Sequence, residues 1–229
     1  FRKWASPTTY YSGVADTYID LYHPAANYGN SGTAKIHPGA EGKERTLIKF
    51  DLSSIPASAT VTQATLNFFC WYRSAQYRVT GHAYPILRHW NENEATWNAP
   101  VKGSTWGAAG CRDPLTDYHG VSGVTTTLNF SNQFYQWDVT TIAQGWVANP
   151  AQNEGVLILA EGPSAEYQFR TSEIISIDQR PYLQVTYLLE TPTATPTSTP
   201  TATLTTPTPT SSPTATTTPS GDPTPSSTP

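Results

Sequence analysis

The sequence predicts an all-β protein: a two-sheet antiparallel sandwich of jelly-roll type with one short helix, followed by an extended tail rich in Thr and Pro. Apolar residues alternate with polar ones almost throughout residues 15–189, and a period of two is typical of half-buried strands. One stretch, DVTTIAQGWVANP, has helical spacing instead. Many short strands with little helix favour two packed sheets.

The strand RTLIKFDL is predicted from its alternation. Ile48, Phe50 and Leu52 share one face, while Lys49 and Asp51 share the other. Such a strand is buried on one side and open to water on the other. The runs GVLILAE and PYLQVTYLL are also expected to be strands near the core.

The run ATLNFFCWY is expected to form a central strand. One face carries Ala64, Leu66, Phe68, Cys70 and Tyr72. Phe69 and Trp71 make the second face apolar too, so this strand is expected to be covered on both sides.

The helix is expected at DVTTIAQGWVANP. Thr140 or Thr141 can cap its start, and Ile142 and Trp146 are spaced i,i+4 on one face. Pro150 is expected to end it.

The chain is divided here into an N-terminal arm (residues 1–13), a sandwich (residues 14–190) and a tail (residues 191–229). In the tail, 17 of 39 residues are Thr, 10 are Pro and 6 are Ser. So few apolar side chains cannot offset the entropy of folding, and the prolines favour an extended polyproline-II-like chain. Such composition is typical of O-glycosylated stalks. The expected acceptors are Thr193, Thr195, Thr197, Thr199, Thr201, Thr208 and Thr216.

Charge and hydropathy narrow the range of partners. The net charge of −4 gives no electrostatic reason to expect nucleic acid or an anionic membrane. No apolar run approaches the ~20 residues that a membrane span needs. Phe1 is not an initiator Met, which favours a chain that follows a removed signal peptide. We therefore expect an extracellular or cell-surface protein.

The two cysteines, Cys70 and Cys111, are expected to form a disulfide. Closing a loop of that length would stabilise the fold by roughly 4 kcal/mol. The alternative is a buried thiol at Cys70 and an incidental one at Cys111. The cysteines and histidines show no metal-ligand spacing, so no cofactor is expected. Structural Ca²⁺ held by acids such as Asp16 or Asp51 is possible but not readable from sequence, because its ligands come from distant loops.

The stretch HWNENEATWNAP most suggests a site. Trp90, Trp97 and the nearby Trp106 can stack on sugars, and Glu92 can bind hydroxyls. The alternative is that the tryptophans plug the sandwich while the acids face water. Glu92 and Glu94 have a spacing compatible with a glycosidase pair, but nothing else in the sequence supports hydrolysis.

Basic residues offer a second candidate surface. Arg45 and Lys49, with Lys35 and Lys43, line one expected sheet face that suits an acidic polysaccharide such as a uronate polymer. A solvated face is the alternative.

Several motifs carry a resemblance to a known family. The DNRLRE domain, which overlaps carbohydrate-binding module family 96, is resembled by the stretches VADTYID, NYG, RTLIKFDLSSIPASATVTQATLNFF, W.ENEATWN, WDVTTIAQGW, FRTSE and RPYLQVTY. The likeness covers about residues 14–189. It implies a secreted, non-catalytic β-sandwich of the kind found on surface proteins and beside polysaccharide-active enzymes.

The arm carries four aromatic residues, Phe1, Trp4, Tyr10 and Tyr11, whose apolar surface is costly to leave in water. It either closes its own sandwich or adds a strand to a neighbouring copy. Arm and stalk together favour a self-associating, filament-like surface subunit that binds copies of itself. The alternative function is a polysaccharide-binding module.

Overall fold

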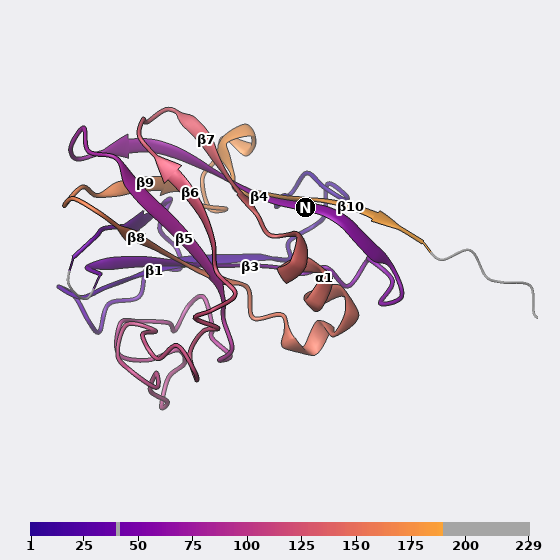
Figure 1. Ribbon diagram of the computed structural model, residues 1–229, viewed down its shortest axis with the longest axis horizontal. Coiled ribbons are helices and arrows are strands. Elements are labelled where there is room, and N and C mark those ends of the chain that lie inside the picture. The colour runs from indigo at the N-terminus through magenta and orange to yellow at the C-terminus, as the bar shows by residue number, and fades with distance from the viewer. Residues whose placement is uncertain (40–41, 190–229) are drawn as a thin grey trace, which may run out of the picture. The chain divides into compact units, whose positions relative to one another are not determined.

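The computed structural model describes residues 1–39 and 42–189 (Figure 1). These residues form ten strands in two antiparallel sheets. The first sheet has the order β1 (Val14–Asp20), β3 (Glu44–Phe50), β8 (Val156–Glu161), β5 (Val79–Pro85) and β6 (Val124–Leu128). The second has the order β10 (Tyr182–Leu188), β4 (Thr60–Arg73), β9 (Tyr167–Arg170) and β2 (Thr33–Ile36), with β7 (Gln133–Asp138) also paired to β4. The predicted all-β sandwich is confirmed for this part of the chain.

The main core lies between the two sheets. Ile48, Phe50 and Leu52 are all buried in it, so the face predicted for RTLIKFDL is confirmed. Strands β8 and β10 match the other two predicted core strands, and Leu183 of β10 is buried in the same core.

Strand β4 is central, as predicted. Its first part pairs with β10 and its last part with β9, while β7 pairs along the other edge. The prediction that both faces are covered was wrong, because Phe69 and Trp71 lie on the outer face and are only half-buried. Tyr72 was placed on the wrong face. A register shift between Cys70 and Tyr72 sets Tyr72 opposite Gln168, and Tyr72 is 42% exposed.

Helix α1 (Thr140–Ala148) is confirmed, with Ile142 and Trp146 buried in the main core. Its predicted cap was wrong. Thr140 donates its backbone N–H to Asp138 Oδ1 over 3.0 Å and its hydroxyl to the same oxygen over 2.5 Å. The Thr140 hydroxyl also accepts the N–H of Ala64 in β4 over 2.9 Å, so it joins the helix to the second sheet. Two short 3-10 helices, Pro150–Gln152 and Ile177–Gln179, complete the described elements.

A second core cluster lies on the outer face of the first sheet. Ile19, Leu47 and Leu157 project from β1, β3 and β8 on the side opposite to the main core, and the long loop of residues 86–123 packs onto them. In Figure 1 this loop folds beneath the strands of the first sheet. The first sheet is therefore covered on both faces.

The predicted disulfide is wrong, since Cys70 and Cys111 are both free. Cys70 lies in the main core on β4, whereas Cys111 lies in the second cluster, in the long loop. The first sheet stands between the two clusters, which keeps the thiols apart. Burial raises the pKa of the Cys70 thiol to about 12, so the thiol stays protonated and unreactive.

The arm lies against its own sandwich, as one of the two alternatives expected. The N-terminal ammonium donates to the carbonyl oxygen of Leu183 over 2.6 Å, and the Leu183 N–H donates to the Phe1 carbonyl oxygen over 3.0 Å. The rings of Phe1 and Tyr11 meet edge to face at 5.5 Å. Trp4 and Tyr10 stay 45% and 85% exposed. The predicted tail and its glycosylation sites lie outside the described residues.

Candidate functional site

The three tryptophans predicted to stack on sugars are core residues. Trp90, Trp97 and Trp106 are only 2%, 3% and 4% exposed and belong to the second cluster. The indole N–H of Trp90 donates to the Glu154 carbonyl over 2.8 Å, and that of Trp106 to the Thr96 carbonyl over 2.9 Å. Rings without an open face cannot stack on a ligand, so this prediction was wrong. The three tryptophans fill the second core cluster, between the long loop and the first sheet, and not the space between the two sheets.

Glu92 and Glu94, the two acids of the same stretch, accept hydrogen bonds from backbone N–H groups and do not face a common ligand. Glu92 accepts the N–H of Asp16 over 2.7 Å, and Glu94 accepts the N–H of Lys102 over 2.8 Å. These contacts fix two different parts of the long loop. Their arrangement gives no support to a glycosidase pair.

The basic residues predicted on one sheet face also contact the long loop. Arg45 donates to the carbonyl oxygens of Gly110 and Cys111 over 2.9 and 3.1 Å, and it is buried. Lys49 lies 3.1 Å from Glu154. Burial of Arg45 excludes it both from a ligand-binding face and from a solvated one, so its predicted role in carbohydrate binding was wrong.

The outer face of the second sheet carries a different set of aromatic side chains, which we call the aromatic face. It comprises Phe69, Trp71 and Tyr72 of β4, Phe134 of β7 and Tyr182 of β10. Ring centroids are 5.2 Å apart for Phe69 and Phe134, 5.4 Å for Phe134 and Tyr182, and 5.6 Å for Trp71 and Tyr72. Contact between neighbours holds each ring in place, which lowers the entropy lost when a ligand binds.

The β-bulge in β4 creates this arrangement. One extra residue on a strand places two consecutive side chains on the same face. Trp71 and Tyr72 are that pair, which is why strict alternation assigned Tyr72 to the core. The signal that sequence analysis missed is the second apolar face of ATLNFFCWY, which we interpreted as covered.

Two guanidinium groups lie over the aromatic face. The Arg170 guanidinium is 4.3 Å from the centroid of the Trp71 ring, and that of Arg2 is 4.2 Å from the Tyr182 ring. Arg170 Nε has no hydrogen-bond partner among the described residues. A buried donor in that state is costly. Amide groups lie nearby, with Gln136 donating to Asn67 over 2.9 Å.

Comparison with known families identifies the chain. The model of carbohydrate-binding module family 96 matches residues 7–187, which is most of the sequence. The chain belongs to carbohydrate-binding module family 96. No curated protein matches it. Within its described residues, this family 96 module has no helix that is long and apolar enough to cross a membrane.

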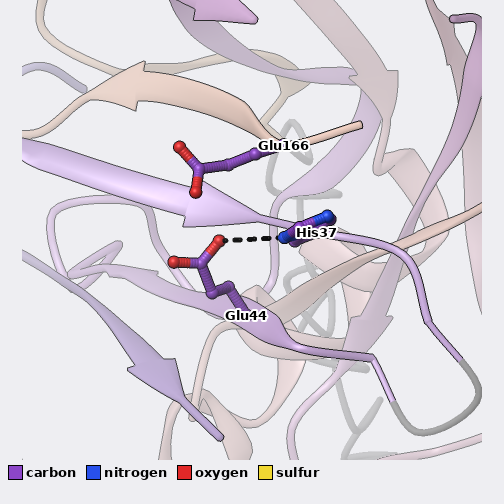
Figure 2. Close-up of side chains that lie close together, drawn as sticks. All are labelled: His37, Glu44 and Glu166. Carbon is purple, nitrogen blue, oxygen red and sulfur yellow. Dashed lines mark ion pairs between the residues drawn. The ribbon is translucent and has the colours of Figure 1, made fainter. Parts of the chain in front are cut away.

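A cluster of ionisable side chains closes one end of the module's sandwich, where β2 leads into β3. Figure 2 shows His37, Glu44 and Glu166 converging there, with His37 Nδ1 3.7 Å from a Glu44 carboxylate oxygen. Lys35 lies 3.2 Å from Glu44 and 3.5 Å from Glu166. Burial, followed by the nearby Glu166 carboxylate, raises the pKa of Glu44 to about 7.

One ligand atom from each of these three residues lies within 4.8 Å of the others, so the cluster has the reach of a metal site. The Lys35 ammonium already supplies a positive charge between the two carboxylates. Lys43 stands beside the cluster, 3.5 Å from Ser164. The ion pairs between β2, β3 and β9 therefore join the two sheets by themselves.

The module also has a groove of about 980 Å³ beside α1. His89, His119, Glu154 and the exposed Val121 line it, together with the helix residues Thr141 and Gly145. His89 is held 3.1 Å from Glu154. The groove is large enough for an oligosaccharide, but the tryptophan in its lining, Trp146, is buried.

Proposed function

We propose that this family 96 module binds polysaccharide on the aromatic face of the second sheet, without catalysis. The observation that carries the proposal is the set of five ring side chains on a sheet face that faces away from both cores. Rings of this kind stack on the apolar faces of sugars, while neighbouring amides and guanidinium groups bind hydroxyls. Family membership supports carbohydrate as the ligand class.

The spacing of the rings suits an extended polymer. Tyr182, Phe69 and Phe134 lie on three adjacent strands, in the register that pairs Phe69 with Phe134 and Asn67 with Tyr182. The ring centroids are 5.2 Å apart for Phe69 and Phe134 and 5.4 Å apart for Phe134 and Tyr182, so the three rings form one continuous surface across β10, β4 and β7. A continuous ring surface favours contact with a polymer chain that lies across these strands.

We infer that the preferred polymer is acidic. Arg170 and Arg2 lie over the aromatic face, and a guanidinium group binds carboxylates with two parallel hydrogen bonds. A uronate polymer offers a carboxylate on each unit, and we propose it as the ligand of an extracellular or cell-surface protein.

Affinity electrophoresis against a uronate polymer and a neutral glucan tests the proposal. Tyr72→Ala and Arg170→Gln should each abolish most of the retention by the uronate gel. Tyr22→Ala is the matched control, because Tyr22 is an exposed tyrosine in the loop that follows β1. It should bind like the wild type. Reducing ends should not accumulate in either polymer.

Two outcomes would contradict the proposal. Retention that is insensitive to Tyr72→Ala and Arg170→Gln but lost in His119→Ala would move the site to the groove beside α1. Steady release of reducing ends that Glu92→Gln abolishes would make the protein an enzyme.

Self-association and glycosylation stay predictions. Phe1 is hydrogen-bonded to Leu183 in β10 of its own chain, so we do not propose the arm as a strand donated to a neighbour. The exposed Trp4 and Tyr10 are the arm residues left for contact with a second copy. Light scattering of the wild type and of a Trp4→Ser, Tyr10→Ser variant tests this, with loss of higher oligomers expected in the variant. Intact-mass spectrometry of native material should show hexose additions if the tail is glycosylated.

A further inference from the structure

Three carboxylates meet at the open edge of the sandwich, apart from the aromatic face. Asp16 projects from β1, Glu92 belongs to the long loop and Glu173 follows β9. One oxygen of each lies within 4.8 Å of the other two. Asp16 is fully buried, with 0% of its surface exposed. Segments from both sheets and from the loop therefore bring three acids together.

Two carboxylate oxygens of this cluster have no hydrogen-bond partner among the described residues. Asp16 Oδ2 accepts the backbone N–H of Ser172 over 2.9 Å, and Glu92 Oε1 accepts that of Asp16 over 2.7 Å. Glu173 Oε1 accepts from Lys3 Nζ over 2.7 Å and from the Ser172 hydroxyl over 2.8 Å. Asp16 Oδ1 and Glu173 Oε2 are buried and have no partner among the described residues.

The charges of the cluster do not balance. Three ionised carboxylates face one ammonium, that of Lys3, which leaves two negative charges in a buried setting. Either a proton or a cation is needed to relieve this repulsion.

We propose that Asp16, Glu92 and Glu173 bind a Ca²⁺ ion. A divalent cation cancels the two excess negative charges and gives the two leftover oxygens a partner. All the donors are carboxylate oxygens, which are hard ligands, and no nitrogen or sulfur ligand favours zinc. Calcium accepts an irregular set of oxygen ligands more readily than magnesium, which requires near-ideal octahedral geometry.

The ion would act as a clamp. It joins β1 of the first sheet, the loop after β9 of the second sheet and the long loop, and Lys3 adds the arm through Glu173. Such a bridge couples four segments that are distant in sequence, so its removal loosens the edge of the sandwich.

The test uses the full chain, stripped with a chelator and titrated with Ca²⁺ in a calorimeter and in thermal melts. The wild type should bind one ion per chain and show a saturable rise in Tm. Asp16→Asn keeps the shape of the side chain but removes its charge, and it should weaken Ca²⁺ binding at least tenfold. Glu173→Gln serves as a second variant if Asp16→Asn does not fold. Asp51→Asn, which alters an exposed acid on β3's end, should respond to Ca²⁺ like the wild type.

Shared protonation of Asp16 and Glu173 is the competing explanation. It predicts no heat of Ca²⁺ binding and no rise in Tm, and that result would overturn the proposal. An unchanged Ca²⁺ response in Asp16→Asn or Glu173→Gln would also overturn it. A response lost in Glu44→Gln instead would place the ion in the cluster of Figure 2. Equal affinity for Mg²⁺ would rule out the assignment to calcium.

Discussion

Replacing Glu44 with Gln should stabilise the protein above neutral pH and have little effect in mild acid. Glu44 is buried between Lys35, His37 and Glu166 (Figure 2). Its pKa is about 7 in the folded protein, against an ordinary value of 4.5. The folded state thus binds the proton more tightly than the unfolded state, and ionisation of Glu44 opposes folding.

The magnitude follows from the two pKa values. This contribution to stability is fully present below pH 4.5 and is lost as the pH rises through 7. Between pH 5 and pH 8 the wild type should lose about 2.5 kcal/mol through this group. Gln has the same shape but no charge, so Glu44→Gln should avoid that loss. For a protein of this size the difference corresponds to roughly 5–10 °C in Tm at pH 8.

Chemical unfolding of both proteins at several pH values measures the effect. The quantity of interest is the difference between the two free energies of unfolding, because groups away from Glu44, such as Asp16, titrate in both proteins and largely cancel. Glu94→Gln is the control, since Glu94 is exposed. It should shift stability by less than about 0.5 kcal/mol at every pH.

A difference that does not change with pH would refute the reasoning, because it would mean that Glu44 ionises as easily in the folded protein as in the unfolded chain. Destabilisation by Glu44→Gln at pH 8 would show that the ion pair with Lys35 outweighs the cost of burying the charge.

Three further predictions concern the buried Trp97, the two free cysteines and the N-terminal arm. Trp97→Ala should lower the free energy of unfolding by about 3–5 kcal/mol, because it removes a large core ring. The folded variant should still be retained by the polysaccharide gel. Loss of retention without loss of stability would show that Trp97 belongs to the binding site. A reductant should leave Tm unchanged because Cys70 and Cys111 are free, and a clear drop would reveal a bridge. Deleting the arm should lower the free energy of unfolding by about 2 kcal/mol, because the half-buried rings of Phe1 and Tyr11 are lost. Equal stability of the truncated and full-length proteins would show that the packing of these rings contributes little.

The strands could be predicted because each one obeys a local rule. Ile48, Phe50 and Leu52 alternate with polar residues, and burial of one sheet face enforces that alternation. The rule fails at Tyr72, where a single bulged residue reverses the assignment of faces. No local pattern marks a bulge in an apolar run, so the aromatic face could not be derived from periodicity.

The candidate site was mislocated for a different reason. Trp90, Trp97 and Trp106 lie in a loop without strands, and an aromatic residue in a loop carries no periodic signal of burial. Whether such a ring contacts solvent depends on how the loop folds back onto the first sheet. Asp16 and Glu173 meet across 156 residues or more of chain, as the Ser172–Asp16 hydrogen bond illustrates. Contacts of that range follow from the topology of the whole sandwich.

The loop that packs onto the first sheet also limits the valency of the module. Because residues 86–123 cover the outer face of the first sheet, the described part of a single copy offers a polymer one sheet face, that of the second sheet. Under the proposed function, an isolated module therefore coats a polysaccharide chain but does not cross-link two of them. Cross-linking a polysaccharide gel would require chains that carry two tethered modules, or modules that pair with one another. Avidity would then depend on the effective concentration that the tether or the pairing contact sets.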